Sequence, residues 1–372
     1  MIFFSSKRNK SEKPDYLFLL VFAVLIIFGL VVLASASADL GKIKFNDTYY
    51  YLKHQVLYGL SLGILGFLVT YHIYYKQYKK IALWLLILSI IGVGLMLFTP
   101  LGRSAGGSTR GLSVGPITLQ PSELLKVTFL IYLAAWLSRP GGNRKTDLLK
   151  GFLPFLMLSG LAALLLILEP ATSTVFILIG SALIVYFMSG AKFMYIILTV
   201  VVGVICLAAL VFVTPYRLQR FSSFFTPNQD LQGSGFQKNQ ALITIGSGGL
   251  TGVGYGQSVN KYNYLPESIG DSIFAIIAGE FGFIGVAGFI SVFLILLLRG
   301  FLIARQVRDE FGKLLMIGFT CLLGLQAFVN IGAISGVLPI TGVTLPFISY
   351  GGTSLAVLMT TVGIMANISK YT

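Results

Sequence analysis

Long apolar runs alternate with short polar turns along the whole chain. Each run approaches the roughly 20 residues that an α-helix needs to cross a hydrocarbon core about 30 Å thick. The runs lack the alternation of a membrane β-barrel, and helices are the other way to satisfy every backbone polar group within lipid. The pattern predicts about ten membrane helices, at residues 16–37, 54–71, 81–99, 122–138, 152–168, 171–189, 193–214, 272–298, 314–336 and 347–368.

Composition indicates the same class of protein. Hydrophobic residues make up 56% of the chain and charged residues 11%, with a mean hydropathy of +0.86, which exceeds what a soluble domain of 372 residues can bury. We therefore expect an all-α, polytopic membrane bundle that forms one integral membrane domain over residues 1–372.

Charge predicts the orientation of the bundle. With the N-terminus in the cytoplasm, 17 of the 27 basic residues and only five of the 13 acidic residues fall on the cytoplasmic side. The positive-inside rule then predicts that both termini are cytoplasmic and that residues 1–15 form a cytoplasmic tail. Topology and contact with anionic lipid account for the net charge of +14, so nucleic acid is not an expected partner.

The longest connection, residues 215–270, is predicted to be an extracellular loop between helices seven and eight. A connection of this length usually forms a lid or a binding surface. Residues 236–245 have the pattern of a short amphipathic helix. The glycine cluster at 246–256 matches neither nucleotide-binding motif, although its backbone amides suit close approach to a lipid pyrophosphate.

Asp271 stands where this polar loop meets the next apolar run. A carboxylate at the outer boundary of the membrane is a candidate base for chemistry on a lipid-borne substrate. Aspartate is also favoured as the N-cap of a helix, so a capping role is the alternative. Spacing alone leaves both roles open, and they are compatible.

Four charged residues lie in or at the ends of the apolar runs: Glu123, Lys126, Glu169 and Glu280. Each costs about 2.5–3.5 kcal/mol at mid-bilayer unless it is paired or hydrated. Glu123 and Lys126 share one helix face and are expected to pair, either to stabilise packing or to line a substrate cavity. Glu280 lies nine residues after Asp271, on the opposite side of a helix, so a contact between helices is expected for it.

Two long motifs and the segment around Asp271 carry a resemblance. The runs 338–354 (LPITGVTLPFISYGGTS) and 119–126 (LQPSELLK) resemble the SEDS family (shape, elongation, division and sporulation) of FtsW/RodA type, and the similarity covers nearly the whole chain. Thr344 favours the division type, FtsW. The chain departs from the family pattern at Ile269-Gly270, where His-Thr is more frequent, and at residues 169–174, where an acidic residue is missing.

The resemblance implies a peptidoglycan glycosyltransferase with ten helices in the bacterial cytoplasmic membrane. Such an enzyme polymerises lipid II at the outer face, with a class B penicillin-binding transpeptidase and other divisome or elongasome membrane proteins as partners. The resemblance places the catalytic aspartate at Asp271 and residues of a polar cavity at Glu123, Lys126 and Arg220.

The chemistry of this transfer requires a base for the acceptor hydroxyl and cations for the departing pyrophosphate. Asp271 is the candidate general base of an inverting mechanism without a covalent intermediate. Glu267, four residues earlier, is a further candidate substrate-binding residue. Candidate cations for the pyrophosphate are Arg220, Lys126, Arg110 and Lys53, with or without Mg²⁺ or Mn²⁺, and no other cofactor is expected.

Two other functions compete with the enzyme. Ten helices with charges in the membrane also suit a lipid II flippase or another transporter. A non-catalytic scaffold of a division complex is the third candidate. The polar residues gather at the outer face, around Asp271, Arg220, Arg110 and Glu123, and this distribution favours the enzyme over a path through the inner half of the bundle.

Overall fold

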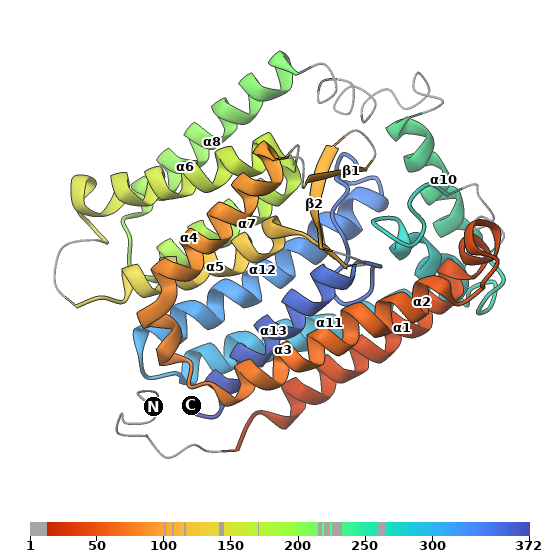
Figure 1. Cartoon of the computed structure of the whole chain (residues 1–372), viewed down its shortest axis with the longest axis horizontal. Coiled ribbons are helices and arrows are strands. Elements are labelled where there is room, and N and C mark those ends of the chain that lie inside the picture. Colours follow the sequence, from red (N-terminus) through yellow and green to blue (C-terminus); the bar gives the residue numbers. More distant parts are fainter. Residues whose placement is uncertain are drawn as a thin grey trace.

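The computed structural model describes residues 13–99, 102–105, 108–114, 117–140, 145–169, 171–214, 218, 224, 233–258 and 265–372 (Figure 1). All ten predicted apolar runs lie on helices, so the predicted polytopic bundle is confirmed.

Two of the membrane helices contain a π-helical turn. Helix α2 (Tyr50–His54) is continued by the turn η1 (Gln55–Leu60) and α3 (Ser61–His72), and the turn η2 (Leu148–Phe152) is continued by α6 (Leu153–Leu168). The other helices are α1 (Tyr16–Phe45), α4 (Lys76–Phe98), α5 (Pro121–Leu137), α7 (Thr172–Met188), α8 (Phe193–Val213), α11 (Ile273–Gln306), α12 (Glu310–Ile334) and α13 (Gly352–Ser369).

Helix α12 lies at the centre of the bundle and α8 at its edge (Figure 1). Among the described residues, eight helical stretches are long and apolar enough to cross a membrane. In the most apolar part of α12, 78% of the residues are buried, against 6% in α8. Helices α5 and α7 are shorter, at 17 residues each, and both pack against α12. The central helices therefore face protein, whereas α8 presents its side chains to lipid.

The start of α1 and the end of α13 lie together at one end of the bundle. Asp15 caps α1 by accepting a hydrogen bond from the Phe18 N–H (2.8 Å), and its own N–H donates to Ser369 Oγ (3.2 Å). Asp15 also forms an ion pair with Arg299 near the end of α11. Further pairs at this end are Lys76 with Asp309, the N-cap of α12, and Lys145 with Glu310. We refer to this end as the basic end.

Two connections at the opposite end contain secondary structure of their own. The strands β1 (Gly102–Ala105), β2 (Ser108–Val114) and β3 (Ile117–Leu119) form a three-stranded antiparallel sheet in the order β1-β2-β3, which the sequence pattern does not predict. Helix α10 (Ser234–Ser247) contains the predicted short helix at 236–245, so this prediction is confirmed.

Glycines allow α3 and α13 to approach closely. A Cβ at Gly363 would lie 2.6 Å from the carbonyl oxygen of Phe67, and one at Gly66 would overlap Thr360 Oγ1. The same contact carries a hydrogen bond from Thr70 Oγ1 to the Thr360 carbonyl (2.9 Å). Small residues and a side-chain hydrogen bond are the usual means by which helices associate in lipid, where apolar burial gives little driving force.

Replacing Gly363 by alanine tests this contact. Because the backbone of Phe67 cannot move away cheaply, we expect Gly363→Ala to destabilise the protein by about 1–3 kcal/mol. Thermal unfolding of the detergent-solubilised protein measures the loss. Gly160→Ala on α6 is the control, since a Cβ there meets open space and alanine is the better helix residue. Equal melting temperatures for the two variants would contradict the close packing.

Candidate functional site

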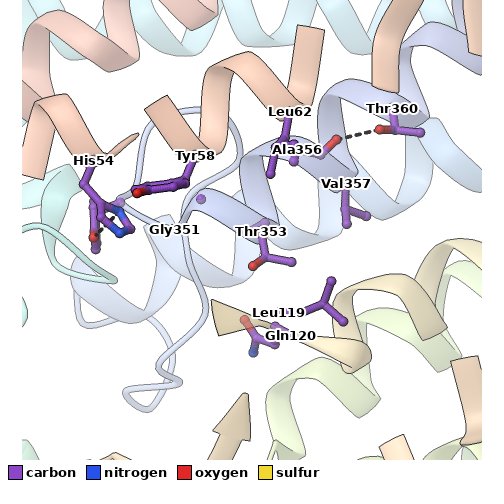
Figure 2. A pocket seen from close by; sticks show the side chains of 13 residues that line it. His54, Tyr58, Leu62, Leu119, Gln120, Gly351, Thr353, Ala356, Val357 and Thr360 are labelled. Atoms are coloured by element: carbon purple, nitrogen blue, oxygen red, sulfur yellow. Dashed lines mark hydrogen bonds between the residues drawn. The ribbon is translucent and has the colours of Figure 1, made fainter. Parts of the chain in front are cut away.

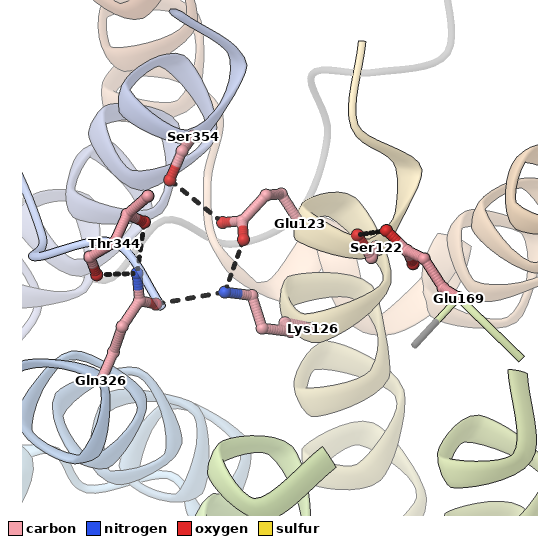
Figure 3. Close-up of polar contacts among 7 residues, drawn as sticks. All are labelled: Ser122, Glu123, Lys126, Glu169, Gln326, Thr344 and Ser354. Atoms are coloured by element: carbon pink, nitrogen blue, oxygen red, sulfur yellow. Dashed lines mark hydrogen bonds and ion pairs between the residues drawn. The ribbon is translucent and has the colours of Figure 1, made fainter. Parts of the chain in front are cut away.

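A buried ion pair on α5 forms the centre of the polar site (Figure 3). Lys126 Nζ lies 2.8 Å from Glu123 Oε1, and the two side chains are 3% and 10% exposed. The residues are one helical turn apart, so α5 alone brings them together. The predicted pairing is confirmed.

Side chains from three other parts of the chain complete the coordination of the pair. Lys126 Nζ donates to Gln326 Oε1 of α12 (3.1 Å), and Ser354 Oγ of α13 donates to Glu123 Oε2 (3.3 Å). Gln326 Nε2 in turn donates to the carbonyl and hydroxyl oxygens of Thr344 (3.1 and 3.4 Å). A buried charge is tolerated only with such partners, and the pair therefore joins α5, α12, α13 and the segment between the last two.

Glu169 fixes the outer end of α5. Its side chain is fully buried at the end of α6, and its Oε1 accepts a hydrogen bond from Ser122 Oγ (2.8 Å) beside Glu123 (Figure 3). In the same connection, Ser173 Oγ donates to the Thr341 carbonyl (3.1 Å). These contacts show what the connection around residues 169–174 does in this chain: it links α5 to the segment that precedes α13.

Asp271 lies in a turn immediately before α11 and is buried, with 8% of its surface exposed. Its Oδ1 accepts a hydrogen bond from Gln237 Nε2 of α10 (3.0 Å), and its backbone carbonyl accepts one from Asn330 Nδ2 of α12 (2.8 Å). The N-cap position of α11 is occupied by Ser272, so the alternative of Asp271 as the helix cap is wrong. Two amides from different helices therefore fix the position of this carboxylate.

The segment Val343–Tyr350 connects the Asp271 turn with the buried ion pair. Ser349 Oγ donates to the Gly270 carbonyl (2.7 Å), and the Tyr350 N–H donates to the Ile269 carbonyl (2.8 Å). Asn330 Nδ2, which holds Asp271, also donates to the Val343 carbonyl (2.6 Å). Thr344, the next residue, contacts Gln326 of the ion-pair network. A single segment therefore sets the relative position of the two candidate groups.

A cavity of about 370 Å³ lies between the η1–α3 helix, the start of α13 and the link from β3 to α5 (Figure 2). Ser354 lies in its wall and donates to Glu123 behind it. Tyr350 also lines the cavity, and its hydroxyl is hydrogen-bonded to His54 Nδ1 (2.9 Å). An apolar cavity with a few converging polar groups is typical of a small-ligand site. The lining residues are His54, Tyr58, Leu62, Leu119, Gln120, Tyr350, Gly351, Gly352, Thr353, Ser354, Ala356, Val357 and Thr360.

Asp271 does not itself line this cavity. It is connected to the cavity wall through Tyr350, whose backbone binds the Asp271 turn. The structure therefore places the buried pair behind one part of the wall, at Ser354, and the carboxylate turn behind another.

The other predicted site residues are arranged differently. Lys53 is exposed and bound to Asp47 (2.8 Å), and this ammonium, with the Tyr49 N–H, holds the pKa of the Asp47 carboxyl below its usual range. Glu267 is exposed in the Asp271 turn, where its carbonyl accepts hydrogen bonds from the N–H groups of Gly270 (2.9 Å) and Ser272 (3.2 Å). Arg110 lies on β2, but its side chain, like the whole of Arg220, is outside the described part of the chain.

Several residues of this site were missed in the sequence. Gln326 and Asn330 are four residues apart in an otherwise apolar stretch of α12, which places both on one helix face and was a usable signal. Nothing in the sequence connects His54 with Tyr350, almost 300 residues away. Gln237 lies in a predicted helix, but nothing in the sequence pairs it with Asp271.

The fold is therefore that of a polytopic membrane protein with a polar site in its interior. That site is the Glu123–Lys126 ion pair, which lies behind the wall of a cavity. The family model described as cell cycle protein, FtsW/RodA/SpoVE, matches residues 15–372. The chain therefore belongs to the FtsW/RodA/SpoVE family, and the resemblance seen in its motifs is confirmed.

Individual relatives and solved structures agree with this assignment. The chain is 34% identical over 363 residues to stage V sporulation protein E of Bacillus subtilis, covering 98% of this chain and 99% of that protein. It is 37% identical over 376 residues to a probable peptidoglycan glycosyltransferase FtsW of Nitrosomonas europaea, covering 98% and 95%.

Among solved structures, a chain from work on the structural coordination of polymerization and crosslinking by a peptidoglycan synthase complex superposes with a TM-score of 0.80 at 25% identity, covering 96% of this chain and 97% of that one. The rod shape determining protein RodA of Thermus thermophilus superposes with a TM-score of 0.70, also at 25% identity, covering 96% of both chains.

Removing one partner of the buried ion pair tests its contribution to stability. We expect Lys126→Met to destabilise the protein by about 3–5 kcal/mol, because it leaves the Glu123 carboxylate buried without its counter-charge. Adding Glu123→Gln to Lys126→Met removes that charge, so the double variant is expected to be more stable than Lys126→Met alone. Thermal unfolding of the three proteins measures both effects. A wild-type melting temperature for Lys126→Met would show that the pair is hydrated.

Proposed function

We propose that this protein is a peptidoglycan glycosyltransferase that polymerises lipid II at the outer face of the cytoplasmic membrane, in cell division or elongation. The observation that carries the proposal is the Asp271 carboxylate, which is buried and held by Gln237. Its turn is hydrogen-bonded to Tyr350 in the wall of a cavity that the Glu123–Lys126 pair backs. The names of the relatives, probable peptidoglycan glycosyltransferase FtsW, support the substrate class and the reaction.

In the proposed mechanism, Asp271 is the general base. The 4-hydroxyl of the acceptor sugar attacks the anomeric carbon of the donor, a new C–O bond forms, and the bond to the pyrophosphate breaks. The hydroxyl proton passes to the Asp271 carboxylate, and the undecaprenyl pyrophosphate leaves as the anion. The Gln237 amide fixes the orientation of this carboxylate, and such positioning is a large part of the advantage of an enzymatic base.

The cationic residues would bind the pyrophosphate in this scheme. Lys126 is neutralised by Glu123 and held by Gln326. We therefore propose that this pair supports the cavity wall and that Lys126 does not bind the pyrophosphate directly. Lys53 near the outer end of α2, and Arg110 and Arg220 in the outer connections, are then the candidates for direct phosphate contacts. Glu267 stays a candidate substrate-binding residue beside Asp271.

A divalent cation would have few protein ligands here. The described residues contain no group of three or more histidine, cysteine, aspartate or glutamate side chains that could hold a metal ion. Mg²⁺ is commonly bound through one or two carboxylates together with substrate phosphates. Asp271 and Glu267, in one turn, are the carboxylates that suit a Mg²⁺ or Mn²⁺ brought in with the pyrophosphate.

We propose that the basic end faces the cytoplasm and the Asp271 turn faces the outside. Lys76, Lys145 and Arg299 lie at the end where α1 starts and α13 finishes, as the positive-inside rule requires of the cytoplasmic side. Asp271 precedes the start of α11 and Arg299 lies near its end, and the part of the helix beyond the break at Gly282, residues 283–299, alone spans about 25 Å. Both termini are then cytoplasmic.

The proposed partners are a class B penicillin-binding transpeptidase and other membrane proteins of the division or elongation machinery. The similarity to a chain of a peptidoglycan synthase complex that coordinates polymerization and crosslinking supports a transpeptidase partner.

Replacing the carboxylate tests the mechanism. We expect Asp271→Asn to lower glycan-chain formation from lipid II by about 10²- to 10⁴-fold, the usual contribution of a general base, because the amide cannot accept the hydroxyl proton. The assay uses the purified protein with its transpeptidase partner. Asp39→Asn, on the outer part of α1, is the matched control and is expected to keep wild-type activity. Unchanged product with Asp271→Asn would end the role of general base, and lipid scrambling in vesicles without polymer would favour a flippase.

Cysteine labelling tests the orientation. In a Cys206→Ala/Cys321→Ala background, we expect Tyr49→Cys to react with a membrane-impermeant maleimide added to intact spheroplasts, because Tyr49 is exposed near the outer end of α1. Glu310→Cys at the basic end should react only after permeabilisation. The reverse pattern would invert the proposed topology.

A further inference from the structure

Helix α11 is broken at Gly282. This residue has φ 65° and ψ −168°, which separates a first piece, residues 273–281, from the longer remainder. The residues of the first piece are almost all buried. A break inside a helix leaves carbonyl and N–H groups without their usual partners, and such groups are costly away from water.

The loop Gly248–Gly254 fills this break, and we name it the glycine clasp. On one side of the break, the N–H groups of Val253 and Gly254 donate to the carbonyls of Gly279 (3.0 Å) and Glu280 (3.1 Å). On the other side, the clasp accepts: the Phe283 N–H donates to the Gly249 carbonyl (3.0 Å), and the Ile284 N–H to the Leu250 carbonyl (3.1 Å). Four backbone hydrogen bonds thus replace those that the broken helix has lost.

The amides of Val253 and Gly254 are therefore already used within the protein. The hypothesis from the sequence that the amides of the glycine cluster approach a pyrophosphate is wrong for these two residues. The clasp binds the helix instead.

Close backbone contact requires glycine at three positions. A Cβ at Gly248 would overlap the carbonyl oxygen of Ala278, one at Gly252 would overlap that of Glu280, and one at Gly282 would overlap the Gly252 nitrogen. Gly252 and Gly282 also have positive φ angles, of 84° and 65°, which disfavour other residues. Gly246, two residues before the clasp, has open space at its Cβ position.

The clasp begins at Gly248, the C-cap of α10, and α10 runs in the same direction as the first piece of α11. Gln237 near its start donates to Asp271 Oδ1 (3.0 Å), whereas its end, at Gly248, lies against Ala278 and Gly279. The two helical segments are therefore attached to each other at both ends: by a catalytic-site hydrogen bond at one and by the clasp at the other.

Two contacts fix this unit to the membrane-spanning part of α1. Glu280, whose carbonyl is one of the two that the clasp binds, accepts a hydrogen bond from Ser35 Oγ with its side chain (2.5 Å). Tyr255, which follows the clasp, donates its hydroxyl to the Val31 carbonyl (3.0 Å). The break is thus held against a long helix that itself crosses the bundle.

We infer that the glycine clasp is a positioning element for the transfer reaction: it holds α10 and the first piece of α11 as one unit and thereby sets the Asp271 carboxylate against Gln237. This inference rests on the proposed function, since Asp271 is taken as the base. None of the clasp residues lines the cavity described above. We therefore expect the clasp to act on the position of the base rather than on the binding of lipid II.

Gly248→Ala is the test variant, because its Cβ wedges the clasp away from Ala278 without a positive φ to complicate the result. Gly246→Ala is the matched control, and Gly252→Ala is a second wedge at the opposite side of the clasp. Hydrogen exchange by mass spectrometry in nanodiscs, followed on peptides covering residues 265–275 and 276–286, reports whether the clasp and the Asp271 turn loosen. Steady-state polymerisation of lipid II by the same proteins with the transpeptidase partner gives kcat and KM.

We expect faster exchange in both peptides for Gly248→Ala and Gly252→Ala, with Gly246→Ala like the wild type. We expect kcat to fall by about 10- to 100-fold, as displacement of a catalytic group by about 1 Å does, with KM within about twofold of the wild type. A loosened clasp with unchanged kcat, or a rise in KM with unchanged kcat, would overturn the inference, and so would unchanged exchange in both wedge variants.

Failure of the proposed function gives a different result. If the wild-type protein makes no polymer, the proposed activity is wrong, and the exchange data alone decide whether the clasp controls the Asp271 turn. If exchange became faster only in residues 276–286 and not in the turn at 265–275, the clasp would not control the position of the Asp271 turn.

Discussion

The structure depends on one constraint: a charge buried among apolar helices must be surrounded by polar partners. The Glu123–Lys126 pair meets it with Gln326 and Ser354, which come from helices far along the chain. Removing two charges from water costs several kcal/mol for each charge. The helices are therefore stable only when they pack with Gln326 and Ser354 at the same height in the bundle as the ion pair. The pair therefore fixes the relative heights of α5, α12 and α13, and the cavity between α3 and α13 follows from that arrangement.

The same constraint explains the backbone at the outer end of the bundle. The segment Val343–Tyr350 has little regular secondary structure, and its polar groups are satisfied by Gln326, Asn330 and the Asp271 turn. In α11, the groups freed at Gly282 are satisfied by the glycine clasp. Irregular backbone is tolerated within the membrane only where other parts of the protein cover it. Both segments help to position side chains of the candidate site. The segment Val343–Tyr350 binds the Asp271 turn directly, whereas the glycine clasp lies at the other end of the first piece of α11.

The sequence predicts the helices well because a bilayer imposes a length and an apolar composition on each of them. It also predicts the pairing of Glu123 with Lys126, since three residues on a helix place two side chains on one face. The partners of that pair could not be predicted in the same way. Lys126 and Gln326 are 200 residues apart in the chain, and the contact depends on how the helices pack.

The connections were predicted least well. The strands at residues 102–119 are short and lie in a stretch rich in glycine and serine, so no alternation distinguished them from a plain loop. The glycine cluster at 246–256 was compared with phosphate-binding motifs, whereas its glycines serve close contact with a helix that begins more than 20 residues later. Glycine spacing alone does not reveal whether the close neighbour is a ligand or another part of the backbone.

The distribution of polar groups across the bundle bears on the choice between catalysis and transport. Between Lys126 and the basic end, α5 presents Leu130 and Leu133 to the interior, and α12 presents Phe319 and Leu322 between Gln326 and that end; all four are at most 1% exposed. The hydroxyl of Thr320 in this region is bonded to a carbonyl of its own helix. A path for a charged headgroup needs polar groups that continue to the other face. Between the ion pair and the basic end, these two helices carry no charged side chain, and the hydroxyl of Thr128 on α5 is hydrogen-bonded to Ser89 of α4 (2.7 Å). This distribution favours a site that acts on its substrate from one side of the membrane.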